Sequence, residues 1–177
     1  MKKEFEKSKS KDKEERYEAY HNILEATEQK VDWAYEVWDQ LLEDLTHNDN
    51  HQRSRAAQYL ANLAISDPER RMLRDFSRVW KVTYDEKFVT ARHSLQSIWK
   101  FGLAGKEQEE MVMKYMVDRF ENSMNEKNYT LIRSDIIQNM RNLFDHLDDE
   151  KIKQTAMKLI ETVDDKKYKK KYMGIWK

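Results

Sequence analysis

The chain has 177 residues, 37% of them charged and 39% apolar, and its 33 basic and 33 acidic side chains cancel to a formal net charge of zero. It has no cysteine, three glycines and one proline. This composition excludes disulfide scaffolds, cysteine zinc sites, turn-rich β-sandwiches and folds built on glycine-rich phosphate loops.

The charges are distributed unevenly along the chain. Residues 14–50 hold eleven acidic and two basic side chains, whereas residues 51–106 hold eleven basic and five acidic ones. Both ends are rich in lysine. Such a dipolar arrangement bears on association and on partners rather than on the fold.

The first predicted helical region follows a polar start. Residues 1–13 are basic, and we expect them to be disordered. Over residues 14–46, apolar side chains recur every seven residues, with a second row three positions further on, as in a coiled-coil seam. We expect one long acidic capping helix here, or a helix pair with a break near residues 27–30. The two rows are Tyr17, Leu24, Val31, Trp38 and Leu45, and Tyr20, Thr27, Ala34 and Leu41.

Six further amphipathic helices are predicted between residues 51 and 163. The first of them ends before Ser66. The second begins at Asp67-Pro68, with Pro68 in its first turn. The third begins after Asp85 and ends at Gly102. Three more follow before residue 163. No segment alternates with period two, so the prediction is an all-α fold of about seven helices, followed by a basic aromatic tail at residues 164–177.

Three of these helices share one pattern of spacing. The matching stretches are Arg53-x-x-Ala56-Ala57-x-Tyr59-Leu60-x-x-Leu63, Arg133-x-x-Ile136-Ile137-x-Asn139-Met140-x-x-Leu143 and Lys153-x-x-Ala156-Met157-x-Leu159-Ile160-x-x-Val163. The pattern resembles the inner helices of HEAT repeats, over roughly residues 50–163. The resemblance implies a short right-handed α-α superhelix, a HEAT- or armadillo-like solenoid, within a single domain at residues 14–163. The alternatives are a helical bundle and a coiled-coil dimer seeded by residues 17–45.

The sequence contains no motif for catalysis. It has no nucleophile elbow, phosphate loop or kinase signature, so we expect neither catalytic residues nor a cofactor. His47, Asp49 and His51 are residue types that ligate metals, but the intervening Asn-Asp-Asn favours a turn and a helix cap, and we expect no metal site.

Arginine gives the clearest indication of function. Seven of the eleven arginines lie between residues 53 and 92. Arg70, Arg74 and Arg78 are four apart and are predicted to form a basic stripe on one helix face. Such a stripe binds phosphates, or it pairs with the acidic first segment within the molecule. Four arginines are expected on the concave surface of the inner helices: Arg53, Arg55, Arg92 and Arg133.

We therefore expect a HEAT-like, non-catalytic interaction module that binds a protein partner through its concave surface or a helix face. The alternative is nucleic-acid binding through the Arg70–Arg78 stripe. Some HEAT-like proteins recognise alkylated DNA, so the resemblance includes this activity within the nucleic-acid alternative. Asp75 and Trp80 are the candidate residues of such a site. No apolar run reaches the roughly 18 residues of a membrane span, and the start has no apolar signal core, so we expect a cytoplasmic location.

Overall fold

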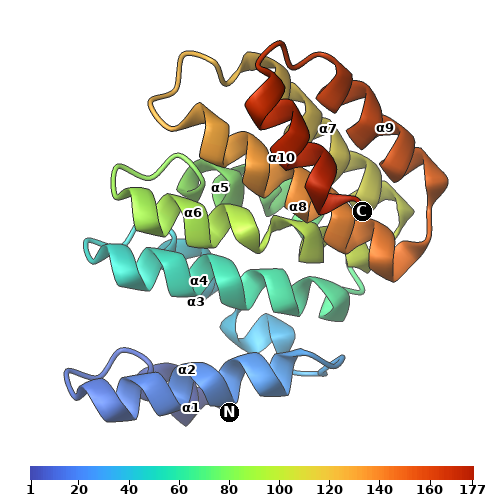
Figure 1. Ribbon diagram of the computed structural model, residues 1–177. Helices are drawn as coiled ribbons and strands as arrows, with labels where there is room; N and C mark the ends of the chain where they lie inside the picture. The colour runs from blue at the N-terminus through green and yellow to red at the C-terminus, as the bar shows by residue number, and fades with distance from the viewer. The chain divides into compact units, whose positions relative to one another are not determined.

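Helices account for all the regular structure of the chain. The computed structural model describes residues 1–177 and contains ten α-helices, two short 3₁₀ helices and no strand (Figure 1). The prediction of an all-α fold is confirmed, whereas the predicted number of about seven helices is too low. Additional helices form at both ends of the chain, and a break divides the first predicted helical region into two helices. No helix is both long enough and apolar enough to cross a membrane.

The chain divides into two compact units, Met1–Ser94 and Leu95–Lys177. The single domain over residues 14–163 stays a prediction. The first unit contains α1 (Lys2–Lys7), α2 (Lys13–Thr27), α3 (Ala34–Asp44), α4 (Asn50–Leu63), η1 (Ala64–Ser66), α5 (Met72–Val82) and most of α6 (Phe88–Gln96). The second contains η2 (Ile98–Ala104), α7 (Lys106–Asn122), α8 (Tyr129–Leu147), α9 (Glu150–Glu161) and α10 (Lys166–Ile175).

Aspartate carboxylates bind backbone N–H groups at or just before the starts of four helices in the first unit. Each carboxylate accepts a hydrogen bond from a backbone N–H that has no partner within its own helix. Asp67 bonds to the N–H groups of Arg71 and Met72, at 2.9 and 2.8 Å, so α5 begins at Met72 and Pro68 lies in the preceding turn rather than in the helix. Asp12 and Asp49 are the N-cap residues of α2 and α4, and Asp67 and Asp85 accept hydrogen bonds from the N–H groups of Arg71 and Lys87, the residues just before α5 and α6.

A break between α2 and α3 divides the predicted long helix. Thr27 Oγ1 donates to the carbonyl oxygen of Ile23 at 2.6 Å, and Asn62 of α4 donates to the carbonyl oxygen of Leu24 at 3.1 Å. These bonds satisfy groups at the end of α2, and the helix-pair alternative is the one the structure contains. Beyond the break, Trp38 and Leu41 are buried within the unit, where α3 packs against α4. That half of the seam therefore forms the core rather than a surface for a second copy.

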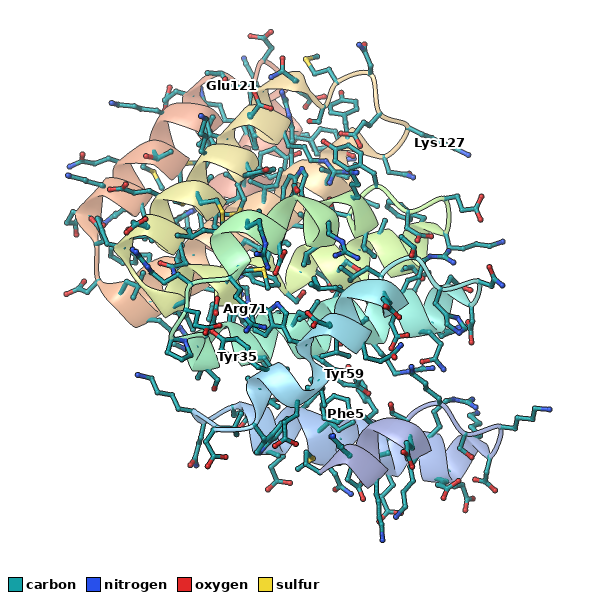
Figure 2. All side chains as sticks on the ribbon, turned by 180° about the vertical axis from the view of Figure 1, so that it is seen from behind. Phe5, Tyr35, Tyr59, Arg71, Glu121 and Lys127 are labelled. Carbon is teal, nitrogen blue, oxygen red and sulfur yellow. The ribbon has the colours of Figure 1, made fainter.

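Residues at the start of the chain form a helix where the sequence predicts disorder. The ring of Phe5 on α1 makes edge contacts with Trp33 and Tyr59, with centroid distances of 5.9 and 5.4 Å (Figure 2). Lys9 Nζ lies 2.7 Å from Asp44 Oδ2 and ties the end of this segment to α3. The Phe5 ring, this ion pair and the hydrogen bond that Asn22 Nδ2 of α2 donates to Glu4 Oε2 at 3.2 Å hold α1 against the rest of the unit.

The second unit is built around α8, which packs against α7, α9, α10 and η2. Gly102 permits the close approach of η2, because a Cβ atom there would lie 2.9 Å from Leu143 Cδ1. The basic tail forms α10, and its Tyr172 is buried and donates to the carbonyl oxygen of Thr130 at 2.8 Å. Trp176 is also buried, so these two tail aromatics belong to the core of the unit.

Candidate binding groove

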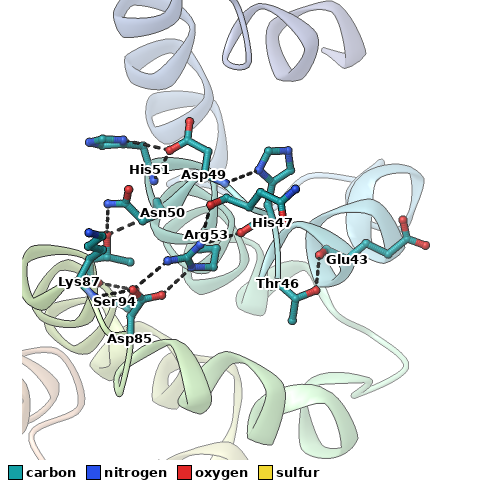
Figure 3. A network of polar contacts seen from close by, with 12 residues as sticks. Glu43, Thr46, His47, Asp49, Asn50, His51, Arg53, Asp85, Lys87 and Ser94 are labelled. Carbon is teal, nitrogen blue, oxygen red and sulfur yellow. Dashed lines mark hydrogen bonds and ion pairs between the residues drawn. The ribbon is translucent and has the colours of Figure 1, made fainter.

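Arg53, predicted to offer charge to a partner, is bonded within the fold (Figure 3). Its Nε and Nη2 donate to the two carboxylate oxygens of Asp85 at 2.6 and 3.0 Å, and its Nη1 donates to the carbonyl oxygen of His47 at 2.7 Å. Burial raises the pKa of the Asp85 carboxyl, but the bonds from Arg53 and from the N–H of Lys87 outweigh it, and the pKa falls below its usual value. Arg53 therefore joins the start of α4 to the start of α6.

The predicted stripe of Arg70, Arg74 and Arg78 is not one helix face. Arg70 lies in the turn before α5 with a positive φ of 54°. Arg74 Nε lies 3.1 Å from Asp75 Oδ1, and Arg78 Nη2 donates to the carbonyl oxygen of Leu42 at 3.1 Å. The spacing misleads because the Asp67 cap delays the start of the helix until Met72.

The side chains around this stripe also make internal contacts. Arg71 stacks on the ring of Tyr35, with its guanidinium carbon 3.8 Å from the ring centroid (Figure 2). Asp75, a candidate member of a DNA-repair site, is buried and accepts a hydrogen bond from Trp38 Nε1 at 3.0 Å. Trp80, the other candidate, is buried as well. Both therefore have structural roles in the first unit.

Two further predicted arginines lie against aromatic rings. Arg133 is buried in the second unit, donates from Nε to the carbonyl oxygen of Phe120 at 3.0 Å, and lies 4.5 Å from the centroid of that ring. Arg92 lies 6.0 Å from the centroid of Phe88. Arg133 therefore stabilises the end of α7 and is not a surface charge.

Arg55, the seventh predicted residue, lies in a surface groove of about 690 Å³ in the first unit. Helices α2, α4 and α6 line this groove, which we call the basic groove. Its cationic side chains are Lys13, Arg16, Arg55 and Lys87, joined by His51 and His93. Its apolar and aromatic side chains are Tyr17, Tyr20, Phe88 and Val89, and its neutral polar side chains are Asn50, Ser54, Gln58 and Thr90.

Hydrogen bonds between neutral side chains order the wall of the basic groove. Tyr20 Oη on α2 donates to Gln58 Oε1 on α4, and Gln58 Nε2 donates to Ser54 Oγ at 3.0 Å. Asn50 Nδ2 donates to Thr90 Oγ1 on α6 at 2.9 Å. These bonds link the three helices that carry the charges, so the cations are presented on a framework with its own polar contacts.

The charge of the basic groove is not balanced by acids in its lining. None of the lining side chains is a carboxylate, and Lys13, Arg55 and Lys87 form no ion pair. Burial lowers the pKa of the Arg55 guanidinium, which stays charged at neutral pH because arginine does not deprotonate in proteins. Tyr17 and Val89, each 65% exposed, add apolar surface. The arrangement suits an anionic ligand that also carries apolar groups.

The histidine cluster at the start of α4 serves a turn and a helix cap. Asp49 Oδ1 accepts from the N–H of His51 at 2.9 Å, and the N–H of Asp49 donates to His47 Nδ1 at 3.0 Å (Figure 3). No three side chains of His, Cys, Asp or Glu gather anywhere in the 177 residues as a metal site would require.

The sequence indicated only part of the basic groove. The sequence predicts Arg55 as a site residue but not Lys13, Arg16 or Lys87, although Arg16 is one of only two basic residues in the acidic stretch 14–50. No protein-family model, curated protein or solved structure matches the chain.

Proposed function

We propose that the chain is a non-catalytic interaction module, and that its basic groove binds an acidic segment of a partner protein. The observation that carries this proposal is a groove lined by four cations and no carboxylate, with exposed Tyr17 and Val89 among its lining residues. Carboxylates of the partner would meet the cations, and its apolar side chains would pack against Tyr17 and Val89.

A protein partner fits these features better than a nucleic acid does. Nucleic-acid binding uses basic side chains for phosphates and aromatic or groove-reading side chains for bases. The exposed Tyr17 ring suits either ligand, whereas exposed Val89 cannot stack on a base and makes an apolar contact that is ordinary in a peptide interface. In the predicted basic stripe, Arg74 pairs with Asp75, and Arg78 donates a hydrogen bond to the carbonyl oxygen of Leu42 on α3.

The HEAT-like repeat is also part of the proposal. Its support is that equivalent positions of the shared pattern have equivalent surroundings: Ala56, Ile136 and Ala156 are buried at 2% exposure or less. Arg53 and Arg133, which occupy one position of the pattern, both bond to neighbouring segments of their own units. The small side chains of Ala56 and Ala156 allow helices to approach closely at this position.

Fluorescence anisotropy tests the proposal with a labelled 12-residue peptide of alternating Glu and Leu. We expect saturable binding that weakens between about 50 and 200 mM salt. Combining Lys13→Glu with Lys87→Glu should weaken binding by about tenfold, because both side chains are exposed, free of ion pairs and lie in the basic groove.

The matched control reverses two exposed lysines of the second unit, Lys114→Glu with Lys158→Glu, which lie outside the basic groove. This double variant should bind the peptide as the unmodified chain does. A 12-nucleotide single-stranded DNA that binds more tightly than the peptide would replace the protein partner with a nucleic acid. Absence of binding to either probe would contradict the proposed role of the groove.

A further inference from the structure

A second hollow of the first unit lies beneath α1 and is lined by α1, α3 and α4. Its volume is about 280 Å³, and its apolar wall includes Phe5, Val37, Leu41 and Ala56. We call it the α1 pocket. It shares one lining residue, Arg55, with the basic groove.

Two polar atoms of the α1 pocket residues are buried without a hydrogen-bond partner. They are the Oη of Tyr59, a residue only 2% exposed, and the Nε of Arg55. The two residues are four apart on α4, so their side chains lie on one face of the helix. Buried polar atoms are normally paired, because leaving one unpaired costs stability.

Both unpaired atoms are hydrogen-bond donors. Burial raises the pKa of the Tyr59 phenol to about 12, against the opposing effects of the Ser8 hydroxyl and the Arg55 charge, so the phenol keeps its proton at neutral pH. The Ser8 hydroxyl itself donates to the carbonyl oxygen of Phe5 at 2.7 Å. The residues that line the pocket therefore hold a cationic N–H and a neutral O–H without partners, and an acceptor with negative charge that reached them would satisfy both.

The acids of the α1 pocket limit the charge that such a ligand can carry. Asp44 is occupied, because it pairs with Lys9 at 2.7 Å and accepts from Gln40 Nε2 at 3.1 Å. Glu6 and Glu36 are exposed among the lining residues and would repel a second negative charge. A monoanion with an apolar body is the best match.

We propose that the α1 pocket binds a small organic monocarboxylate. The carboxylate accepts hydrogen bonds from Tyr59 Oη and Arg55 Nε, and the apolar body packs against Phe5, Val37 and Leu41. This site is distinct from the basic groove, because its apolar wall and Tyr59 do not line the groove. A carboxylate side chain of a bound protein would offer the same chemistry, and the experiment separates the two sources.

Isothermal titration of the full chain with 3-phenylpropionate tests the site. We expect saturable binding with a dissociation constant of about 1 mM or lower, and about tenfold weaker binding of the neutral 3-phenylpropanol. Tyr59→Phe should weaken 3-phenylpropionate binding about fivefold while leaving binding of the Glu-Leu peptide unchanged. Arg55→Lys keeps the charge but removes the Nε donor, and it should also weaken 3-phenylpropionate binding.

Thermal unfolding without ligand completes the test. Because Tyr59 Oη has no partner, Tyr59→Phe should unfold at the same temperature as the unmodified chain or higher. The proposal is overturned by the absence of saturation up to about 10 mM 3-phenylpropionate, or by full affinity in Tyr59→Phe. It is equally overturned if 3-phenylpropionate displaces the labelled Glu-Leu peptide, since the carboxylate would then belong to the partner segment.

Discussion

Replacing Asp85 by Asn removes the charge that holds Arg53 while leaving an oxygen to cap α6. The side chains are 6% and 14% exposed, and two hydrogen bonds of 2.6 and 3.0 Å join them. Removing one partner of a buried pair costs about 3–5 kcal/mol, because the other charge stays buried without compensation. Arg53 and Asp85 are only partly buried, and Arg53 keeps its bond to the carbonyl oxygen of His47, so we expect a smaller loss of about 2 kcal/mol at neutral pH.

Urea denaturation followed by circular dichroism measures this loss, and a double-mutant cycle with Arg53→Met isolates the pairwise energy. The coupling should reach about 2 kcal/mol. The pH dependence gives a second signature. Because the folded-state pKa of Asp85 is lowered, the stabilisation is present above the unfolded pKa of about 3.9 and disappears as the pH falls through the lower folded value. The difference between the unmodified chain and Asp85→Asn should therefore be constant near neutrality and shrink below about pH 4.

Two results would refute this reasoning. A coupling energy below about 0.5 kcal/mol would mean that the pair contributes no more than an exposed ion pair does. A difference that persists unchanged at about pH 2 would assign the loss to packing or capping rather than to the Asp85 charge.

Two further substitutions test packing and a buried hydrogen bond. Gly102→Ala should lower the free energy of unfolding by about 1–2 kcal/mol, because the new Cβ atom would meet the buried side chain of Leu143. Gly174→Ala is the control: its Cβ atom would lie in open space on α10, so this substitution should raise the free energy of unfolding by about 0.5–1 kcal/mol. Equal effects of the two substitutions in urea denaturation would contradict the close approach of η2. Trp38→Phe removes the indole N–H that donates to the buried Asp75 carboxylate. In the same assay, this substitution should lower the free energy of unfolding by about 1–3 kcal/mol. An unchanged free energy of unfolding would show that this hydrogen bond contributes nothing to stability.

The helices that the sequence predicted are those with local signals. Apolar residues at helical spacing and aspartate caps such as Asp67 and Asp85 can be recognised within a few residues of chain. Helix α1 was missed because it has a single large apolar residue, Phe5, whose contacts come from Trp33 and Tyr59, far along the chain. Helix α10 was missed for a similar reason, since Tyr172 is buried by packing on α8 rather than by its own amphipathic pattern.

The binding site was harder to predict than the helices because it depends on tertiary structure. The spacing of Arg70, Arg74 and Arg78 indicated a stripe, but the late start of α5 removed Arg70 from the helix. The basic groove instead gathers Lys13 from α2 and Lys87 from the turn before α6, which are 74 positions apart. Only the packing of α2 and α6 around α4 brings such residues together, and no local pattern records it.

A titration of the ¹⁵N-labelled chain with the Glu-Leu peptide, followed by amide chemical shifts, tests the role of the basic groove most directly. We expect the largest shift changes at residues 13–20, 50–58 and 87–93, which contain the groove lining, and we expect Lys13→Glu combined with Lys87→Glu to suppress them. Shift changes concentrated on the lysines of α10, or spread evenly over both units, would contradict a binding site in the basic groove.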